Sequence, residues 1–181
     1  MKNPSPDQNL FIRELHPEDV TGTYVQWMND PVVARYLETP PGEHTESSVK
    51  AFVGQMLESS TDILFGIFLA GENLKHIGNI KIGGIDRANH NAHVGFLVGD
   101  RSEWGKGYAT KAIELATEHA FQEIGLNKVW AGAYSSNMGS RRALLKAGWK
   151  EVGALSRHVV IDGQWQDKVF LEKLNANFPP L

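Results

Sequence analysis

One stretch of nine residues, 104–112, most constrains what this chain can fold into. It follows an apolar, β-rich run at 93–98 and opens a long pattern in which apolar residues recur at steps of three and four until Gly125. That pattern predicts a helix over 109–124. A strand, a glycine-punctuated turn and a helix in succession direct free backbone N–H groups and the positive end of the helix dipole to one place. The sequence therefore predicts an anion-binding site there.

The glycines of the turn indicate which anion binds. Gly105 and Gly107 are followed by the small residue Ala109, a spacing that suits backbone N–H groups wrapped around a pyrophosphate. The third glycine of the dinucleotide fingerprint and the Gly-Lys-Ser/Thr ending of the P-loop are both missing. An ordinary strand-to-helix loop, with glycines needed only for its geometry, fits the same residues.

Residues 104–109 resemble the acetyl-coenzyme A signature of the GNAT superfamily of N-acetyltransferases, Gln/Arg-x-x-Gly-x-Gly/Ala. Gly107 and Ala109 occupy its last two fixed positions. Trp104 stands where the family usually has Gln or Arg, but the subgroup that resembles the ribosomal-protein N-terminal (Rim-type) acetyltransferases often carries an aromatic-Gly-x-Gly-Tyr form. The resemblance implies that backbone N–H groups bind the pyrophosphate, so the missing side chain does not exclude binding of coenzyme A.

A second motif supports the same family. The run from Asn137 to Trp149 is similar to the family pattern Asn-x-x-Ser-x-x-x-Leu-x-Lys-x-Gly-Phe. Periodicity and turn signals predict strands at 10–15, 63–70, 76–85, 93–98, 128–134, 149–161 and 165–174, and helices at 16–28, 32–37, 45–58, 109–124 and 138–147. This order resembles the GNAT fold, an α/β (α+β) architecture in which a mixed, mostly antiparallel sheet of about seven strands has helices on both faces. Residues 1–181 are expected to form one such domain.

Composition narrows the chemistry. The chain has 181 residues, 41% of them hydrophobic, and no cysteine, which excludes disulfides, thiolate metal sites and a cysteine acyl-enzyme. Direct transfer without a metal is therefore expected. A polar start and the lack of any membrane-length apolar run predict a cytoplasmic protein with no membrane partner.

Charge is unevenly distributed along the chain. The net charge of −3 gives no support to a nucleic-acid partner. Residues 101–150 nevertheless hold eight Lys/Arg against four Asp/Glu, and this excess surrounds the predicted phosphate site, where it favours coenzyme A. Residues 1–62 hold ten acidic against four basic side chains, which suits a cationic amine acceptor.

The resemblance implies the coenzyme-binding set. Its members are Phe96, Leu97, Val98, Trp104, Gly105, Lys106, Gly107, Tyr108, Ala109, Thr110, Asn137 and Arg141. Gly95 in the preceding strand would let the pantetheine approach closely, although a glycine there also fits a β-bulge.

Two residues are the catalytic candidates. His93 occupies a position where related sequences often have Glu, and imidazole titrates near neutrality, so it is the best general base; an ordinary strand histidine is the alternative. The resemblance places Ser140 near the sulfur, with Asn137 on the same helical face, although both residues also suit helix capping. Four further candidates for the base are His90, His158, Asp86 and Asp167.

The acceptor is expected between the first helices and the closing hairpin, bordered by Trp27, Asn29, Tyr36 and Trp165. It could be a protein N-terminus or a small amine, and the Trp-Met-Asn-Asp-Pro break also resembles enzymes that acetylate amino sugars on nucleotide carriers. A non-catalytic acyl-coenzyme A sensor is the alternative from another class, and a nucleotide-binding regulator is disfavoured by the missing P-loop ending. Strand edges near the C-terminal hairpin are consistent with a homodimer.

Overall fold

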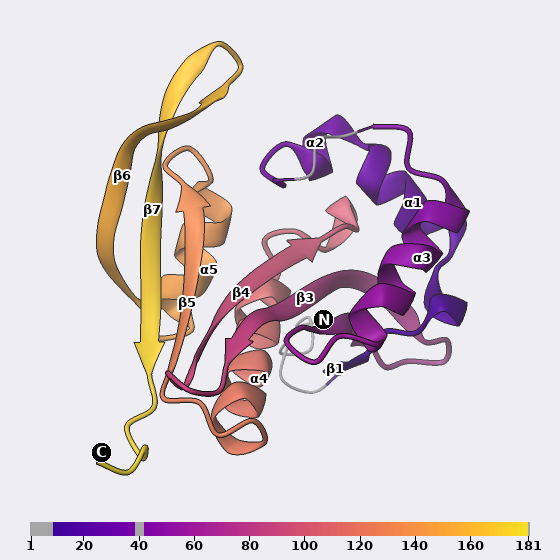
Figure 1. Cartoon of the computed structure of the whole chain (residues 1–181). Coiled ribbons are helices and arrows are strands. Elements are labelled where there is room, and N and C mark those ends of the chain that lie inside the picture. The colour runs from indigo at the N-terminus through magenta and orange to yellow at the C-terminus, as the bar shows by residue number, and fades with distance from the viewer. Residues whose placement is uncertain (1–8, 39–41, 181) are drawn as a thin grey trace, which may run out of the picture.

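A computed structural model describes residues 9–38 and 42–180 of the chain. Within them seven strands form one sheet in the order β1-β2-β3-β4-β5-β7-β6 (Figure 1). The strands are β1 (Leu10–Glu14), β2 (Ile63–Leu69), β3 (Lys75–Asp86), β4 (Asn91–Val98), β5 (Lys128–Tyr134), β6 (Lys150–Ile161) and β7 (Gln164–Leu174). Every neighbouring pair is antiparallel except β4 and β5, which are parallel. The mixed, mostly antiparallel sheet predicted from the sequence is confirmed.

Helices cover both faces of this sheet, as expected. They are α1 (Gly22–Asn29), α2 (Pro31–Ala34), α3 (Glu46–Leu57), α4 (Tyr108–Gln122) and α5 (Met138–Lys146). Apolar residues of α4 and α5 pack on one face, and those of α1 and α3 pack on the other (Figure 1). Because side chains alternate along a strand, Ile80 and Ile82 of β3 point into the α4 core while Lys81 and Gly83 face the opposite side.

The helix predicted over 16–28 is wrong in its first third. Residues Pro17–Asp19 form a 3₁₀ turn, and the chain is extended at Val20 before α1 begins. Val20 is buried in the core beneath α1, and the Thr21 hydroxyl caps the new helix by accepting a hydrogen bond from Tyr24 N. Burial of the Val20 side chain, which requires an extended backbone there, thus outweighs the helix-start signal of Glu18 and Asp19.

Other boundaries match the sequence patterns more closely. The helix predicted at 32–37 is shorter and starts at Pro31, because Asp30 caps it and proline suits the first helical position. Thr45 caps α3 as predicted. The closing hairpin turns at Asp162 and Gly163, and both have positive φ as type I′ turns require.

The parallel pair β4 and β5 stays together only at its start. Residues 91–93 pair with 128–130, and the two strands then separate (Figure 1). β5 continues along β7, and β4 continues along β3, so residues 94–98 lack a strand partner on the β5 side among the described residues. The sheet therefore has a wedge-shaped opening in its middle.

Candidate active site

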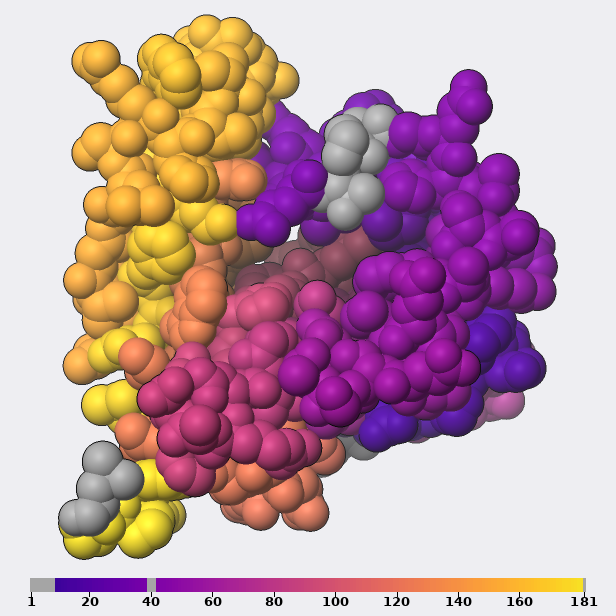
Figure 2. Space-filling view, viewed as in Figure 1, coloured from indigo at the N-terminus to yellow at the C-terminus, as the bar shows by residue number. Residues whose placement is uncertain are grey.

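The wedge between β4 and β5 lies beside the predicted phosphate cradle and beside the two predicted catalytic residues. The N-terminal ends of α4 and α5 both lie beside it, because each helix follows one of the two diverging strands. Figure 2 shows a hollow between the N-terminal helices and the C-terminal hairpin, with β3 and β4 residues at its base. A strand edge with unpaired backbone groups and two helix N-termini at one opening suits a long polar ligand that carries phosphates.

The turn before α4 has the geometry expected of a phosphate cradle. Gly105 and Gly107 have φ values of 76° and 91°, a region that costs other residues about 1–2 kcal/mol. Gly107 is the N-cap of α4 and offers no side chain to cap it, so the first N–H groups of the helix, from Tyr108 to Thr110, keep their hydrogen-bonding capacity. The cradle predicted at 105–110 is thus assembled with its donors available, and these residues fit a pyrophosphate.

Trp104 has a structural role in this cradle. Its indole Nε1 donates a hydrogen bond of 2.7 Å to the carbonyl oxygen of Val98, the last residue of β4. The guanidinium of Arg101 lies 5.9 Å from the centre of its ring. The tryptophan therefore fastens the turn to the end of the strand.

The positive charge around the cradle is smaller than the count of Lys and Arg in residues 101–150 suggests. Lys106 pairs with Glu103 at 2.8 Å, and Lys75 reaches the same carboxylate at 2.7 Å. Burial alone would raise the pKa of Glu103, but the hydrogen bonds from the two lysines outweigh it and keep that pKa below its usual value. Arg141 is likewise paired with Glu151 at 2.7 Å. Much of the positive charge expected near the coenzyme is thus already neutralised.

At the start of α5 the structure supports the capping interpretation of Asn137. Its Oδ1 accepts a hydrogen bond of 3.2 Å from the backbone N–H of Ser140, which closes the N-terminus of the helix. The Ser140 hydroxyl is half-buried and makes no hydrogen bond within the described part of the chain. It remains available to a ligand in the wedge, and its contact with the sulfur stays a prediction.

His93 lies where β4 and β5 begin to diverge. Its ring is half-buried, 5.6 Å from the ring of Trp130, and hydrogen-bonds to none of the described residues. Burial lowers the pKa of His93, and the nearby ammonium of Lys81 lowers it further, whereas Asp62 and Glu38 act in the opposite direction. A neutral imidazole with both nitrogens available suits a general base at neutral pH.

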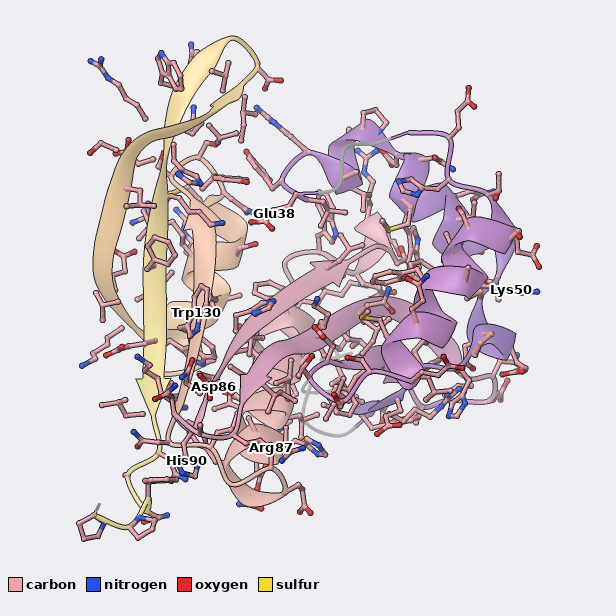
Figure 3. All side chains as sticks on the ribbon, in the orientation of Figure 1. Glu38, Lys50, Asp86, Arg87, His90 and Trp130 are labelled. Atoms are coloured by element: carbon pink, nitrogen blue, oxygen red, sulfur yellow. The ribbon has the colours of Figure 1, made fainter. Side chains whose placement is uncertain are left out.

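The remaining candidates for the base lie elsewhere. Asp86 and His90 are at the β3–β4 turn, at the far end of the sheet from α2 (Figure 3). Asp167 accepts a hydrogen bond from the backbone N–H of Arg157 at 2.8 Å, and His158 is exposed on the edge strand β6. None of these four shares the position of His93 at the vertex of the wedge.

The residues expected to border the acceptor are scattered. Trp27 is only 6% exposed and packs on His76 and Gly99, so it belongs mainly to the core. The amide of Asn29 exchanges two hydrogen bonds with the backbone of His44. Trp165 is exposed near the tip of the hairpin. Of this group, Tyr36 alone spans the opening, because its hydroxyl donates to the carbonyl oxygen of Ser136 at 3.3 Å.

Tyr36 belongs to a segment, 35–38, that connects α2 with the C-terminal half. Arg35 pairs with Asp162 at the hairpin turn, and Glu38 pairs with Lys168 of β7 at 2.6 Å. Figure 3 shows Glu38 reaching toward β5 and β7 across the opening. Sequence patterns gave no signal for Glu38, Lys168 or Asp62, because these residues come from separate elements and meet only in the folded chain.

Across residues 9–38 and 42–180 there is no cluster of three His, Asp or Glu side chains that could hold a metal ion. No helix in that part of the protein is long and apolar enough to span a membrane.

Comparison with known families decides the relationship. The model of the acetyltransferase (GNAT) domain matches residues 9–150, most of the chain. The chain belongs to the GNAT family. As a GNAT acetyltransferase it uses acetyl-coenzyme A to acylate an amine, which confirms the co-substrate and the reaction class implied by the sequence resemblance. The Rim-like subgroup is supported as well.

Individual relatives of this GNAT protein agree. A Bacillus subtilis protein named as a probable N-acetyltransferase, YjcK, is 36% identical over 124 residues, which cover 68% of this chain and 67% of YjcK. Spermidine N-acetyltransferase from Vibrio cholerae, solved with coenzyme A and spermine, superimposes with a TM-score of 0.83 at 20% identity, covering 94% of this chain and 98% of that one. Ribosomal-protein-S5-alanine acetyltransferase from Vibrio fischeri gives 0.82 at 24% identity, covering 96% and 97%. At these identities the two structures establish the fold.

Proposed function

We propose that this GNAT protein transfers an acetyl group from acetyl-coenzyme A directly to a primary amine, with His93 as the general base. The observation that carries the proposal is the position of His93 at the vertex of the wedge, where its half-buried ring makes no hydrogen bond to the described residues. Burial and Lys81 both lower its pKa, so that the imidazole is neutral when an ammonium ion arrives. A base in that state can accept the proton that the amine must lose.

The chain's residues have separate roles in this reaction. Gly105, Gly107 and the first N–H groups of α4 hold the pyrophosphate, and the free edge of β4 at 94–98 lines the path of the pantetheine. Acetyl-coenzyme A supplies the thioester. The neutral amine forms a bond to the carbonyl carbon while the carbon–sulfur bond breaks, and the departing thiolate takes up the proton that the nitrogen loses as the amide forms. The Ser140 hydroxyl donates a hydrogen bond to that sulfur.

Two classes of acceptor are supported by the relatives. One structural neighbour is named for spermidine, and another for the alanine of a ribosomal protein. We propose that the acceptor here is one of these two, a polyamine-like small molecule or a protein N-terminus. Both present a primary ammonium ion on a slender chain. Among the described residues, no feature of the site favours an amino-sugar nucleotide or a sensor without turnover. The cytoplasmic location, the single domain and the homodimer remain predictions.

Thermal stabilisation and thiol release test the proposal together. Acetyl-coenzyme A should raise the unfolding midpoint of the wild type, because it binds only the folded state, and Gly107→Trp should abolish the shift by filling the cradle. Wild-type protein with acetyl-coenzyme A should then release free thiol when spermidine or an alanine-initiated hexapeptide is added. A thermal shift without thiol release from either amine would contradict the proposed acceptors, and no shift at saturating ligand would contradict the coenzyme site.

A further inference from the structure

Four residues form a row across the sheet beside the wedge. Gly83 of β3 pairs with His93 of β4, and His93 pairs with Trp130 of β5. Asp62 immediately precedes β2, where Ile63 pairs with Ile82, so Asp62 lies next to Gly83 on the other side. All four are on the sheet face opposite the α4 core. Because Gly83 has no side chain, the place that its Cβ would take is a gap, and the carboxylate of Asp62 and the imidazole of His93 both extend into it.

Both neighbours of Gly83 lean into this gap. A Cβ atom placed on Gly83 would lie 2.8 Å from Oδ1 of Asp62 and 2.8 Å from Nε2 of His93. Two atoms that are each 2.8 Å from one point are at most 5.6 Å apart. No hydrogen bond joins the side chains of Asp62 and His93 in the described part of the chain, so one donor that lies beside both atoms can bind each of them.

The Asp62 carboxylate is held so that one oxygen faces the gap. Its Oδ2 accepts hydrogen bonds of 3.0 Å from the hydroxyls of Ser59 and Thr61. Oδ1 accepts a single hydrogen bond from within the described residues, a long one of 3.2 Å from Lys81. An ionised carboxylate oxygen can accept two, so Oδ1 keeps one acceptor site. Burial would raise the pKa of Asp62, but the hydrogen bonds from Lys81 and the two hydroxyls keep it below its usual value, so the group stays charged.

We infer that Asp62 and His93 together form the subsite for the ammonium group of the acceptor, above Gly83. Asp62 Oδ1 accepts one N–H bond of the incoming ammonium, and His93 Nε2 accepts a second. The inference rests on the proposed function and assigns it a substrate-binding carboxylate. It also states the chemical class that the subsite selects, a free primary ammonium rather than an uncharged amine.

The subsite has a defined place in the reaction. The ammonium proton that points to His93 moves to Nε2, leaving a neutral amine that is still hydrogen-bonded to Asp62. The amine lone pair then forms the bond to the acetyl carbon while the carbon–sulfur bond breaks, and the second proton lost by the nitrogen goes to the thiolate. His93 releases its own proton to solvent afterwards. Asp62 remains ionised throughout and is a binding residue. Three other charged side chains also act on His93, and each positive charge has a negative partner. Lys81 pairs with Asp62, and Lys168 pairs with Glu38.

The test compares a charged acceptor with an uncharged one. Asp62→Asn should raise KM for spermidine roughly 10- to 100-fold, because the hydrogen bond from the ammonium group loses the negative charge of its acceptor, with a much smaller change in kcat. Hydroxylamine is uncharged at neutral pH, so its catalysed rate, after subtraction of the uncatalysed one, should change less than about twofold. A merely structural role of Asp62 would reduce both reactions equally, and that result, or an unchanged KM for spermidine, would overturn the inference.

Binding without turnover separates this inference from the proposed function. Calorimetry of spermidine, and of the alanine-initiated hexapeptide, with the protein–coenzyme A complex should show affinity that Asp62→Asn weakens by the same factor. If the wild type binds an amine in this way but releases no thiol, the proposed function fails and the subsite stands. If the wild type binds neither amine, or binds one as tightly after Asp62→Asn, the subsite is wrong.

A glycine pair gives an independent check that leaves both polar groups in place. Gly83→Ala puts a methyl group into the gap and should weaken amine binding by a similar factor, since its Cβ meets side-chain atoms that can move aside without unfolding the sheet. Gly153→Ala is the matched control, because this strand glycine on β6 has open space around its Cβ position. Equal amine affinity in the two variants would contradict the subsite.

Discussion

The pH dependence of acetyl transfer gives the sharpest test of His93 as the base. Its pKa lies below the ordinary value of 6.5, first because the ring is half-buried and second because Lys81 is close. A pKa below 6.5 leaves at least about ten neutral imidazoles for each protonated one at pH 7.5. We expect kcat/KM to be level near neutrality and to fall tenfold per pH unit on the acid side, with a midpoint below 6.5.

Two variants should move this midpoint in opposite directions. Lys81→Met removes a positive charge that disfavours the imidazolium, so the midpoint should rise. Asp62→Asn removes a negative charge that favours it, so the midpoint should fall. His93→Gln should lower kcat/KM by about 10²- to 10⁴-fold at pH 7.5 and abolish the acid-side decline, since no imidazole remains to be protonated.

The assay is initial-rate thiol release between pH 5 and pH 9 with spermidine as the acceptor. Primary alkyl amines titrate near the lysine value of about 10.4, so ionisation of the acceptor does not overlap with that of His93. Thermal stabilisation by acetyl-coenzyme A, measured at each pH, controls for loss of coenzyme binding. A midpoint above 6.5, or a midpoint that neither variant moves, would refute the assignment of His93 as the base.

Three further predictions concern the scaffold of the site. Trp104→Phe keeps the ring but loses the bond to Val98, so it should destabilise the cradle by about 1 kcal/mol and weaken acetyl-coenzyme A binding in calorimetry; unchanged affinity would contradict the fastening role. Gly99→Ala would put a Cβ 2.0 Å from the Trp27 ring, and urea unfolding should show a loss of about 1–3 kcal/mol that Gly153→Ala lacks. Burial lowers the pKa of His76, so the folded state favours its neutral form, and stability should decline as pH falls below 6.5, by up to about 1.4 kcal/mol per unit. In urea titrations at pH 5 and 7.5, His76→Phe should reduce that decline.

The parts of the site that sequence patterns predicted are those built from contiguous residues. The cradle at 105–110 follows from two glycines and a helix start, and both the turn and the cap are local geometry. The same holds for the cap at Asn137, where one side chain binds a backbone group three residues later. Because local hydrogen bonds leave a signature in the sequence, the turn before α4 and the start of α5 are both predictable from the residues of two short segments.

The acceptor side depends on tertiary contacts and left no such signature. An aromatic residue at a helix end, such as Trp27, fits a ligand-binding role as well as a core position. In the folded chain its ring fills the space left by Gly99 and is buried. The helix predicted over 16–28 failed for a similar reason, since burial of Val20 is a property of the assembled core. Charge counts misled as well, because Lys106 is paired with Glu103, a buried partner that the sequence does not reveal as buried.

Three glycines explain how the proposed acceptor side of the wedge is assembled. At Gly99 the space is filled by the ring of Trp27, and at Gly132 of β5 a Cβ would lie 2.5 Å from Cε of Lys168, the residue that binds Glu38. The glycine at 83 is different, because the two groups that lean over it are both polar and one of them is the proposed base. All three places are filled by side chains. An indole ring lies over Gly99 and an alkyl chain lies over Gly132, and these two hold N-terminal and C-terminal elements against the sheet. A carboxylate and an imidazole meet over Gly83, and both can accept a hydrogen bond from an ammonium ion, which is why we place the acceptor beside them.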